Sequence, residues 1–578
     1  METLILLAVC FAGYIVAYNT YGRFLARKIF RLDNKREVPS RKINDGIDYV
    51  PSKRGIIFGH HYTSIAGTGP IVGPAIGIIW GWLPAVLWIL LGSIFMGAVH
   101  DFGSLVVSMR NEGRSVSEAA AKYINKRVRF IFFAVVFLTL LIVIAVFGVV
   151  IASVFTLFPN SVIPVWLQIP IAVVLGKAVY KMGANVNIST AAAVIAMYLM
   201  IIAGSYFPIE IPAVMGIPSS GVWVILLLIY AWIASTLPVT TLLQPRDYIN
   251  AWQLFIALTL LIAGAVFSGF STDFAISAPM INKDVPDTTP ALWPFMFVII
   301  ACGAVSGFHS LVASGTSPKQ VEKESDSLFV GYGSMLLEGV LALLVIVCVS
   351  AGIGMALEVD GQILTGSAAW NEQYSTYIGS HGLDSKLRPV VLGAANMMGS
   401  IGIPAAVGTT LMGVFIASFA STTLDTSVRL QRYVVGELAQ DFKIGWLKNR
   451  WAATSLAVLT AAGLAFANGA GGKGALVLWP LFGSANQLLA ALALLVVTLY
   501  LRTKGGKKFI FALIPCIFML IITNWAMVLN EIRFADNGNT LLVIIGGLVF
   551  VLALWVTIEA AVVFCRKPAE QKSSASPT

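Results

Sequence analysis

Long apolar segments alternate with short polar segments along almost the whole chain. Each apolar segment holds about 20 residues with few charges, the length that an α-helix needs to cross a bilayer. The pattern predicts fifteen membrane-spanning helices, at residues 3–22, 55–80, 84–108, 129–157, 164–182, 186–206, 221–243, 248–269, 291–313, 328–354, 404–428, 452–468, 475–501, 509–529 and 540–564. Residues 388–402 are rich in Gly and Met and are predicted to be re-entrant or an additional partial helix. We therefore expect an all-α polytopic membrane protein.

The composition agrees with this class. Of the 578 residues, 58% are hydrophobic and 11% are charged, whereas soluble proteins carry about 25% charged residues. The five cysteines are scattered and form no CxxC pair, so neither a disulfide framework nor a thiolate metal site is indicated. We expect no cofactor and no bound metal ion.

The net charge of +10 is distributed unevenly, because the basic residues gather in alternate loops. Short loops rich in Lys and Arg stay on the cytoplasmic side of a membrane. The alternation predicts a multi-pass protein with its N-terminus outside and its C-terminus inside, in contact with the lipid bilayer. It gives no indication of a nucleic acid partner.

The order of the predicted helices suggests six parts. They are an N-terminal helix with a basic cytoplasmic loop (1–54), a first repeat half with a broken helix (55–206), the start of a second repeat half (207–354), an outer loop with the possible re-entrant segment (355–403), C-terminal helices (404–565) and a cytoplasmic tail (566–578).

The predicted helix 55–80 contains residues that a membrane helix rarely tolerates. Gly67-Thr68-Gly69-Pro70 is followed by Gly73-Pro74, and each proline lacks a backbone donor while each glycine weakens the helix. We expect a break there, with unpaired backbone groups that line a cavity. Broken helices near mid-membrane are typical of transporter binding sites. The alternative is a simple proline kink packed between neighbouring helices.

A second interruption is predicted in helix 221–243, which runs in the opposite direction five helices later. It contains Ser235-Thr236-Leu237-Pro238-Val239-Thr240-Thr241 and is followed by Pro245. Two such helices are what a five-plus-five inverted repeat requires. The substrate-binding candidates are Thr63, Ser64, Gly67, Thr68, Gly69, Pro70, Thr236, Thr240, Asn486 and Gln487.

Few ionisable residues lie inside the predicted helices, and such residues are usually functional because burying charge in lipid is costly. Histidine titrates near neutral pH and suits proton coupling. The candidates for proton or ion coupling are His60, His61, His100, Asp101, Ser306, His309, Ser310 and Glu338. The alternative is that these groups only form hydrogen bonds between helices.

Two further questions concern ions. A metal site is disfavoured because His60 and His61 point about 100° apart on a helix and no HExxH spacing occurs. Sodium is the alternative to the proton, since Ser306, Ser310 and Ser314 share one helix face. His309 stands beside this row, and its positive form would repel sodium. These residues alone leave the choice between proton and sodium open.

Four long motifs resemble the signature of the carbon starvation protein A (CstA) family. They are Phe58-Gly59-His60-His61-Tyr62-Thr63-Ser64-Ile65-Ala66-Gly67-Thr68-Gly69-Pro70, Gly97-Ala98-Val99-His100-Asp101-Phe102-Gly103, Thr422-Thr423-Leu424-Asp425-Thr426-Ser427 and Leu478-Trp479-Pro480-Leu481-Phe482-Gly483-Ser484-Ala485-Asn486-Gln487. The resemblance implies a LeuT-like fold of the amino acid/polyamine/organocation (APC) superfamily. It also implies a bacterial or archaeal inner-membrane protein that takes up peptides or pyruvate with protons under carbon starvation.

The sequence thus predicts a secondary active transporter for a small carbon source, either short peptides or a pyruvate-like carboxylate, and not an enzyme. The alternative is a membrane-embedded metal-dependent enzyme or nutrient sensor that uses the buried His and Asp residues. No ATP-binding P-loop motif occurs, which disfavours primary active transport. The sequence does not predict the oligomeric state.

Overall fold

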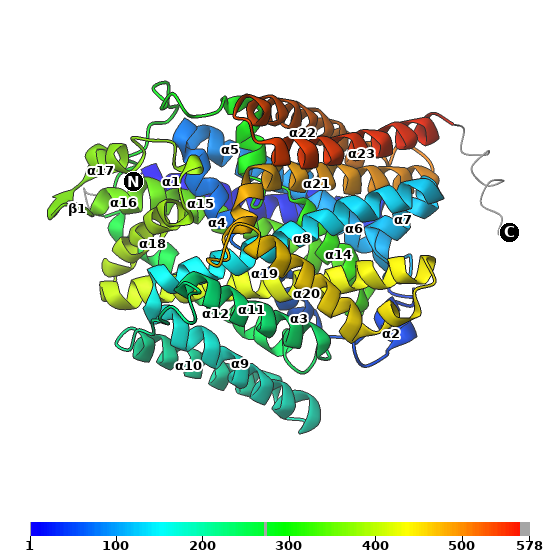
Figure 1. Ribbon diagram of the computed structural model, residues 1–578, viewed down its shortest axis with the longest axis horizontal. Coiled ribbons are helices and arrows are strands. Elements are labelled where there is room, and N and C mark those ends of the chain that lie inside the picture. Colours follow the sequence, from blue (N-terminus) through cyan, green and yellow to red (C-terminus); the bar gives the residue numbers. More distant parts are fainter. Residues whose placement is uncertain (1, 271–273, 567–578) are drawn as a thin grey trace.

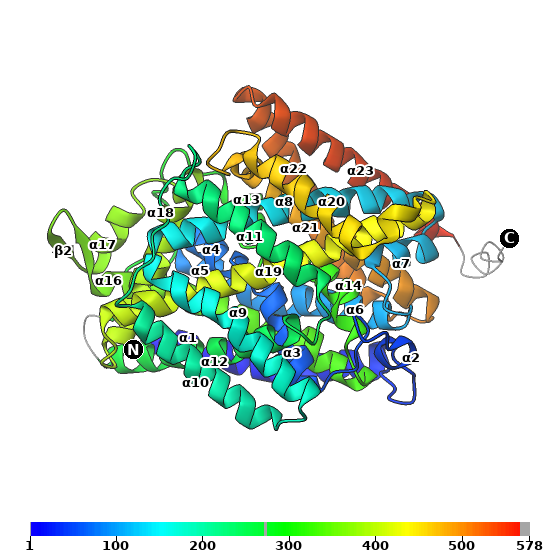
Figure 2. The ribbon, with the colours of Figure 1, turned by 60° about the horizontal axis from the view of Figure 1, so that its bottom comes forward.

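The computed structural model describes residues 2–270 and 274–566, which form a bundle of helices with one short hairpin (Figures 1 and 2). The hairpin pairs strands β1 (Leu357–Val359) and β2 (Gln362–Leu364) antiparallel. The helices of the first half of the described chain are α1 (Glu2–Ala17), α2 (Pro39–Ile43), α3 (Arg54–Ile65), α4 (Gly69–Gly77), α5 (Trp82–Gly92), α6 (Ala98–Met109), α7 (Val116–Tyr123), α8 (Lys126–Leu157), α9 (Val162–Gly176), α10 (Val186–Gly204), α11 (Ser219–Thr236) and α12 (Leu243–Ser268). Those of the second half are α13 (Leu292–Ile299), α14 (Gly307–Gly315), α15 (Ser334–Val347), α16 (Ile353–Met355), α17 (Gly366–Gln373), α18 (Leu383–Gly399), α19 (Ala405–Asp441), α20 (Arg450–Phe466), α21 (Trp479–Thr503), α22 (Ile510–Asp536) and α23 (Thr540–Cys565).

The prediction of an all-α membrane protein is confirmed. By length and apolar composition, twelve helices of the described chain could each cross a membrane, and the bent pair α3–α4 would be a thirteenth. The predicted number of fifteen is not confirmed. Two of the expected helices differ from the prediction, because α20 is short and residues 291–313 are divided between α13 and α14.

The break predicted near Gly67–Pro70 is confirmed. Helix α3 ends at Ile65, α4 begins at Gly69, and the two parts are bent by 45°. Pro70 stands in the first turn of α4, where its missing N–H removes no helical hydrogen bond. The glycines and the proline of this segment therefore interrupt the helix, as the sequence predicted.

The position of the second break was predicted wrongly. Helix α11 runs through Ser219–Thr236 without interruption, Pro238 lies in the turn that follows, and Pro245 lies in the first turn of α12. Prolines are tolerated at both places. The second break lies between α13 and α14, at residues 300–306.

The two breaks pack directly against each other. A Cβ atom added at Gly69 would lie 2.3 Å from the sulfur of Cys302, and one added at Gly73 would lie 2.6 Å from the carbonyl oxygen of Ile299. Gly303 has a φ of +91°, a conformation that favours glycine. Only residues without side chains allow the two interrupted backbones to approach this closely.

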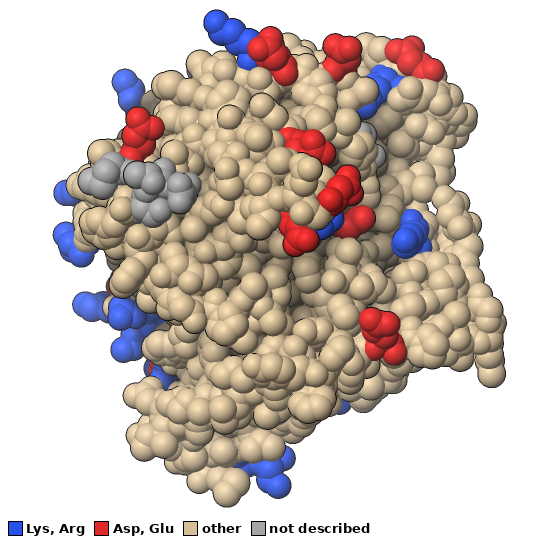
Figure 3. Space-filling model, turned by 90° about the vertical axis from the view of Figure 1, so that its left-hand side faces the viewer, with Lys and Arg blue, Asp and Glu red and all other residues tan. Residues whose placement is uncertain are grey.

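Loops of different character lie at opposite ends of the bundle. Helix α17 and the β-hairpin lie at the left end in Figure 1, whereas α2 and α7 lie at the right end. Acidic side chains are spread over the left-hand end face (Figure 3). The basic loop that contains α2 lies at the other end, in agreement with the alternation of charge in the sequence.

At this second end, the segment between α2 and α3 is attached to the bundle through Asp48. The Asp48 carboxylate accepts hydrogen bonds from Arg429 at 2.8 Å and from Arg432 at 2.9 Å, both on α19. Arg429 also donates to the carbonyl oxygens of Ala234 and Leu237 at the end of α11. Burial favours the neutral carboxyl, but Arg432 and Arg429 outweigh it and hold the pKa of Asp48 below its usual value. One carboxylate thus joins three parts of the chain.

We predict that Asp48→Asn lowers the thermal unfolding temperature of the purified protein at pH 7, whereas the exposed variant Asp284→Asn does not. Arg429 is fully buried, and removing the anion of such a pair costs about 3 kcal/mol. Because the folded-state pKa lies below the unfolded value of 3.8, the stabilisation is complete above that pH and is lost as the pH falls through the lowered pKa. Equal unfolding temperatures of Asp48→Asn and the unmodified protein at pH 7 would contradict the prediction.

Candidate functional site

A cavity of about 340 Å³ lies where the two breaks meet. Its wall contains Gly69 and Val72 of α4, Cys302 of the second break, and Asn486 of α21. Its rim includes loop residues from the end of the bundle that carries α17, among them Pro290, Tyr377, Gly379, Asn537 and Asn539. The cavity therefore connects the acidic end face with the helix breaks.

The N-terminus of α4 forms part of the cavity wall through Gly69. Pro70 has no N–H, and the N–H of Ile71 bonds to the carbonyl oxygen of Thr68. Among the first three residues of α4, Gly69 therefore has the N–H from which a ligand could accept a hydrogen bond. The helix dipole gives this end a partial positive charge. Such a terminus attracts an anion. A helix terminus alone does not define a binding site, but a second positive group faces the same cavity.

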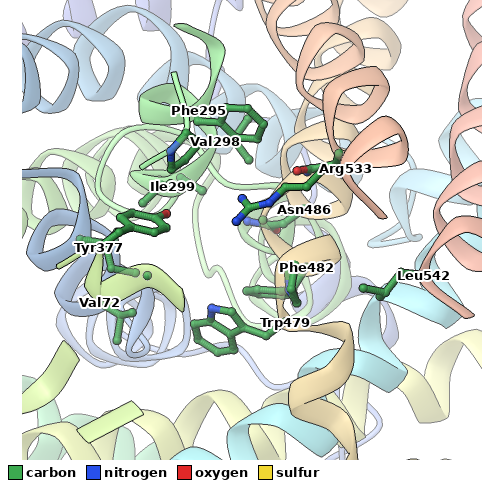
Figure 4. Close-up of a pocket in the computed structure, with 18 of the residues that line it drawn as sticks. Val72, Phe295, Val298, Ile299, Tyr377, Trp479, Phe482, Asn486, Arg533 and Leu542 are labelled. Carbon is green, nitrogen blue, oxygen red and sulfur yellow. The ribbon is translucent and has the colours of Figure 1, made fainter. Parts of the chain in front are cut away.

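That group is Arg533 of α22, whose guanidinium points into the cavity between Tyr377 and Asn486 (Figure 4). Among the described residues that line the cavity, Arg533 is the one charged side chain, and none is Asp or Glu. Lys386 lies over the ring of Trp479, another lining residue, at 5.3 Å from the ring centre. The electrostatic character of the cavity is therefore positive.

Asn486 holds the second break in place. Its side-chain oxygen accepts a hydrogen bond from the N–H of Phe308 at 2.8 Å, and its nitrogen donates to Ser306 at 2.9 Å. The adjacent Gln487 donates to the carbonyl oxygen of Phe297 in α13 at 2.8 Å. Backbone groups freed by a break must find such partners in a membrane protein. The two predicted residues thus satisfy both halves of the interrupted helix.

A buried chain of ionisable groups lies beside Cys302. Asp101 contacts the Nδ1 atoms of His100 at 2.7 Å and of His309 at 3.0 Å. The Nε2 atom of His309 lies 3.3 Å from one oxygen of Glu338, whose other oxygen accepts a hydrogen bond from the N–H of Gly303 at 3.1 Å. Residues from three helices and the second break therefore converge, and the four ionisable side chains have no exposed surface.

A second buried network lies around His60 of α3. Its Nδ1 atom is 2.6 Å from Asp247 and its Nε2 atom is 3.1 Å from Thr316. Arg246 donates to Asp247 at 2.8 Å and also pairs with Asp425. These side chains are at most 1% exposed. The network connects α3, α12 and α19.

The other predicted residues occupy different positions. Thr63 bonds to the carbonyl oxygen of Gly59 in its own helix, and Ser64 contacts Thr426 of α19. Thr236 closes α11, and Thr240 lies in the turn after it. None of these four lines the cavity.

The remaining predicted residues lie around the first break or form hydrogen bonds within the bundle. Thr68 and Pro70 flank Gly69, and a Cβ at Gly67 would lie 2.6 Å from the Thr423 hydroxyl. His61 contacts Ser317 at 2.7 Å, and Ser310 bonds to the preceding turn. Their functional roles remain predictions.

Several residues of these sites were not predicted from the sequence. Arg533 was assigned to a loop because the predicted helix ended at residue 529, whereas α22 continues to Asp536. Arg246 and Asp247 were assigned to a turn between helices, but they lie in the first turns of α12 and are buried. The signal available was a charged Arg-Asp pair immediately before a long apolar run. Cys302 gave no signal, because an isolated cysteine in an apolar segment is usually a core residue.

Two interrupted helices that meet at a cavity inside a polytopic helical bundle define a membrane transporter with discontinuous helices. Residues 2–526 match the model of the family described as carbon starvation protein CstA, and the chain belongs to this family.

Relatives and solved structures agree with this assignment. The chain is 33% identical to the peptide transporter CstA of Campylobacter jejuni, over 93% of this chain and 81% of that protein. It is 31% identical to the pyruvate/proton symporter BtsT of Escherichia coli, over 89% and 80%. The crystal structure of a mutant of the manganese transporter of Eremococcus coleocola has the same fold with a TM-score of 0.51 and 12% identity, over 90% of this chain and 99% of that one.

We predict that Gly69→Leu abolishes transport while the protein still inserts and folds. The added side chain would overlap Cys302 and enter the cavity. Gly463→Leu is the matched control, because Gly463 is exposed on α20 and an added Cβ there meets no atom within 4 Å. Uptake of pyruvate and of dipeptides should be measured with both variants in reconstituted vesicles. If Gly69→Leu takes up substrate at the rate of the unmodified protein, the first break does not form part of the transport path.

Proposed function

We propose that this protein is a proton-coupled secondary transporter that takes up a small carboxylate of the pyruvate type across the cytoplasmic membrane. The observation that carries the proposal is the cavity at the two helix breaks, with one cationic and no anionic side chain among its described lining residues. The relatives and the fold support transport over the enzyme and sensor alternatives. We further propose that the acidic end face lies outside and the end with α2 in the cytoplasm, so that the cavity is open to the outside.

The charges around the cavity favour a carboxylate over a peptide. A carboxylate can accept charge-assisted hydrogen bonds from Arg533 and face the N-terminus of α4. A peptide carries a terminal ammonium group as well, and burying a charge without a partner is costly. The lining residues offer no carboxylate to that ammonium group. Of the two cargo classes named among the relatives, the cavity therefore fits that of the pyruvate/proton symporter better.

For coupling, we propose that the proton binds at the pair of His60 and Asp247. Arg246 is positive and faces two carboxylates, those of Asp247 and Asp425. One positive and two negative charges leave a net charge of −1, which a proton on His60 reduces to zero. Two further ionisable groups adjoin the network. They are Tyr230, which contacts Arg246 and Asp425, and Arg429, which is paired with Asp48 and also interacts electrostatically with Asp425. Because His60 lies on α3, its protonation bears directly on the broken helix.

The proposal is tested by uptake into proteoliposomes that contain the purified protein. Pyruvate and dialanine are compared under an imposed pH gradient without sodium and under a sodium gradient at equal pH. We expect pyruvate to accumulate with the pH gradient alone. Accumulation of dialanine in place of pyruvate would contradict the substrate class, and accumulation with sodium alone would contradict the coupling ion.

We predict that Arg533→Gln raises the KM for pyruvate by tenfold or more with a smaller change in maximal rate. The variant loses a hydrogen bond to a charged group, which contributes about 1.5–3 kcal/mol. Arg388→Gln is the control, because Arg388 is exposed on α18 and does not line this cavity. An unchanged KM in Arg533→Gln would remove Arg533 from the binding site.

We predict that His60→Gln loses pH-driven accumulation of pyruvate but retains exchange of internal for external pyruvate. Glutamine can form hydrogen bonds to Asp247 but cannot take up a proton at physiological pH. His381→Gln has the same substitution at an exposed position and should behave as the unmodified protein. Full accumulation by His60→Gln would place the coupling proton elsewhere.

A further inference from the structure

Three potential metal-ligand side chains lie together next to the cavity. The sulfur of Cys302, a nitrogen of His309 and a carboxylate oxygen of Glu338 are all within 4.8 Å of one another. His309 and Glu338 have no exposed surface, whereas Cys302 is partly exposed and lines the cavity. The group therefore lies at the boundary between the buried network and the space proposed for the substrate.

Two of these ligand atoms lack hydrogen bonds. The Nε2 atom of His309 and the Oε2 atom of Glu338 are buried and make no hydrogen bond of normal geometry to any described residue. Buried polar atoms are almost always satisfied, and these two atoms face each other, as an ion pair when His309 is protonated or as two ligands when a cation lies between them. The two atoms lie 3.3 Å apart. Two ligands bound to one tetrahedral zinc ion at about 2.0–2.1 Å are separated by about 3.3 Å.

The partners of these side chains hold the free atoms toward a common point. Asp101 contacts Nδ1 of His309 and leaves Nε2 for a ligand bond. The N–H of Gly303 occupies one oxygen of Glu338 and leaves the other. A carboxylate on the far nitrogen of a histidine is the usual support for a histidine that binds zinc. Asp101 would therefore act as a positioning residue that orients His309 toward the metal ion.

Within the three ligands the charges balance. A thiolate and a carboxylate together carry −2, and a divalent cation with a neutral histidine brings their sum to zero, while the Asp101 carboxylate outside the ligand set is shared between His100 and His309. A neutral set of this kind is the form in which charged groups are tolerated in a buried place. One sulfur, one nitrogen and one oxygen ligand suit zinc, and sites with three protein ligands keep a fourth position open.

We propose that Cys302, His309 and Glu338 form a zinc site at the floor of the cavity, with the open position toward the cavity. The open position would accept a carboxylate oxygen of the substrate, a part of the inference that rests on the proposed function. The metal ion would be a fixed component of the binding site. The sequence did not indicate this set, because Cys302 was read as an isolated cysteine and Glu338 was considered only for proton or ion coupling.

The site is tested on the purified full-length protein by its zinc content and, after treatment with a chelator, by titration with Co²⁺. We expect about one zinc ion per chain and a sulfur-to-cobalt absorption band in the near ultraviolet. Cys302→Ser should remove the band, and His309→Gln should reduce the metal content at least tenfold. Cys348→Ser and His381→Gln are matched controls that should change neither, because Cys348 is buried elsewhere and His381 is exposed.

Asp101→Asn provides a graded test of its positioning role. Loss of such a supporting carboxylate lowers metal affinity about tenfold to a hundredfold while the ligands remain. An unmodified protein that binds neither zinc nor Co²⁺ would overturn the inference, and so would an unchanged Co²⁺ band in Cys302→Ser. Pyruvate uptake by protein without metal would overturn the zinc site but leave the transporter proposal intact. Stoichiometric zinc without pyruvate uptake would support the zinc site and contradict the proposed transport of pyruvate.

Discussion

The structure depends on one constraint, which is that backbone groups freed inside a membrane must find partners or face a cavity. Two helices are interrupted, and each interruption lies against the other. Gly69 has no side chain and lies against Cys302, while Asn486 and Gln487 bond to the two halves of the second interrupted helix. A cavity follows from this arrangement because the two breaks cannot fill the space that a continuous pair of helices would occupy.

The buried charges are arranged around the same two breaks. The network of His60 and Asp247 lies on the α3 side of the first break, and that of Asp101, His309 and Glu338 lies beside the second. Isolated charges in this environment would be strongly destabilising. Each network instead combines positive and negative groups, and we propose that each takes up one further cation, a proton in the first and a metal ion in the second. Both proposed cation sites thus involve residues next to the elements that form the cavity.

The sequence predicted those features that arise from local chemistry. The glycines and the proline of Gly67-Thr68-Gly69-Pro70 weaken a helix through their own backbone chemistry, so the first break was predicted correctly. The second break, at residues 300–306, contains no proline and was missed, whereas Pro238 suggested a break in helix 221–243 that does not exist. Asp101 and His309 were both candidates for proton or ion coupling, and the structure brings them into contact. Arg533, Arg246 and Cys302 could not be assigned, because their positions depend on the packing of distant helices.

The most direct test of the account is whether pyruvate occupies the cavity at the two breaks. Ile299 lines this cavity (Figure 4), so Ile299→Cys places a thiol in its wall, and the exposed native Cys565 serves as an internal reference. The rate at which a small charged thiol reagent modifies each position is measured by mass spectrometry on purified protein. The account predicts that pyruvate slows modification at position 299 and not at Cys565, and that dialanine slows neither. Equal rates at position 299 with and without saturating pyruvate would contradict it.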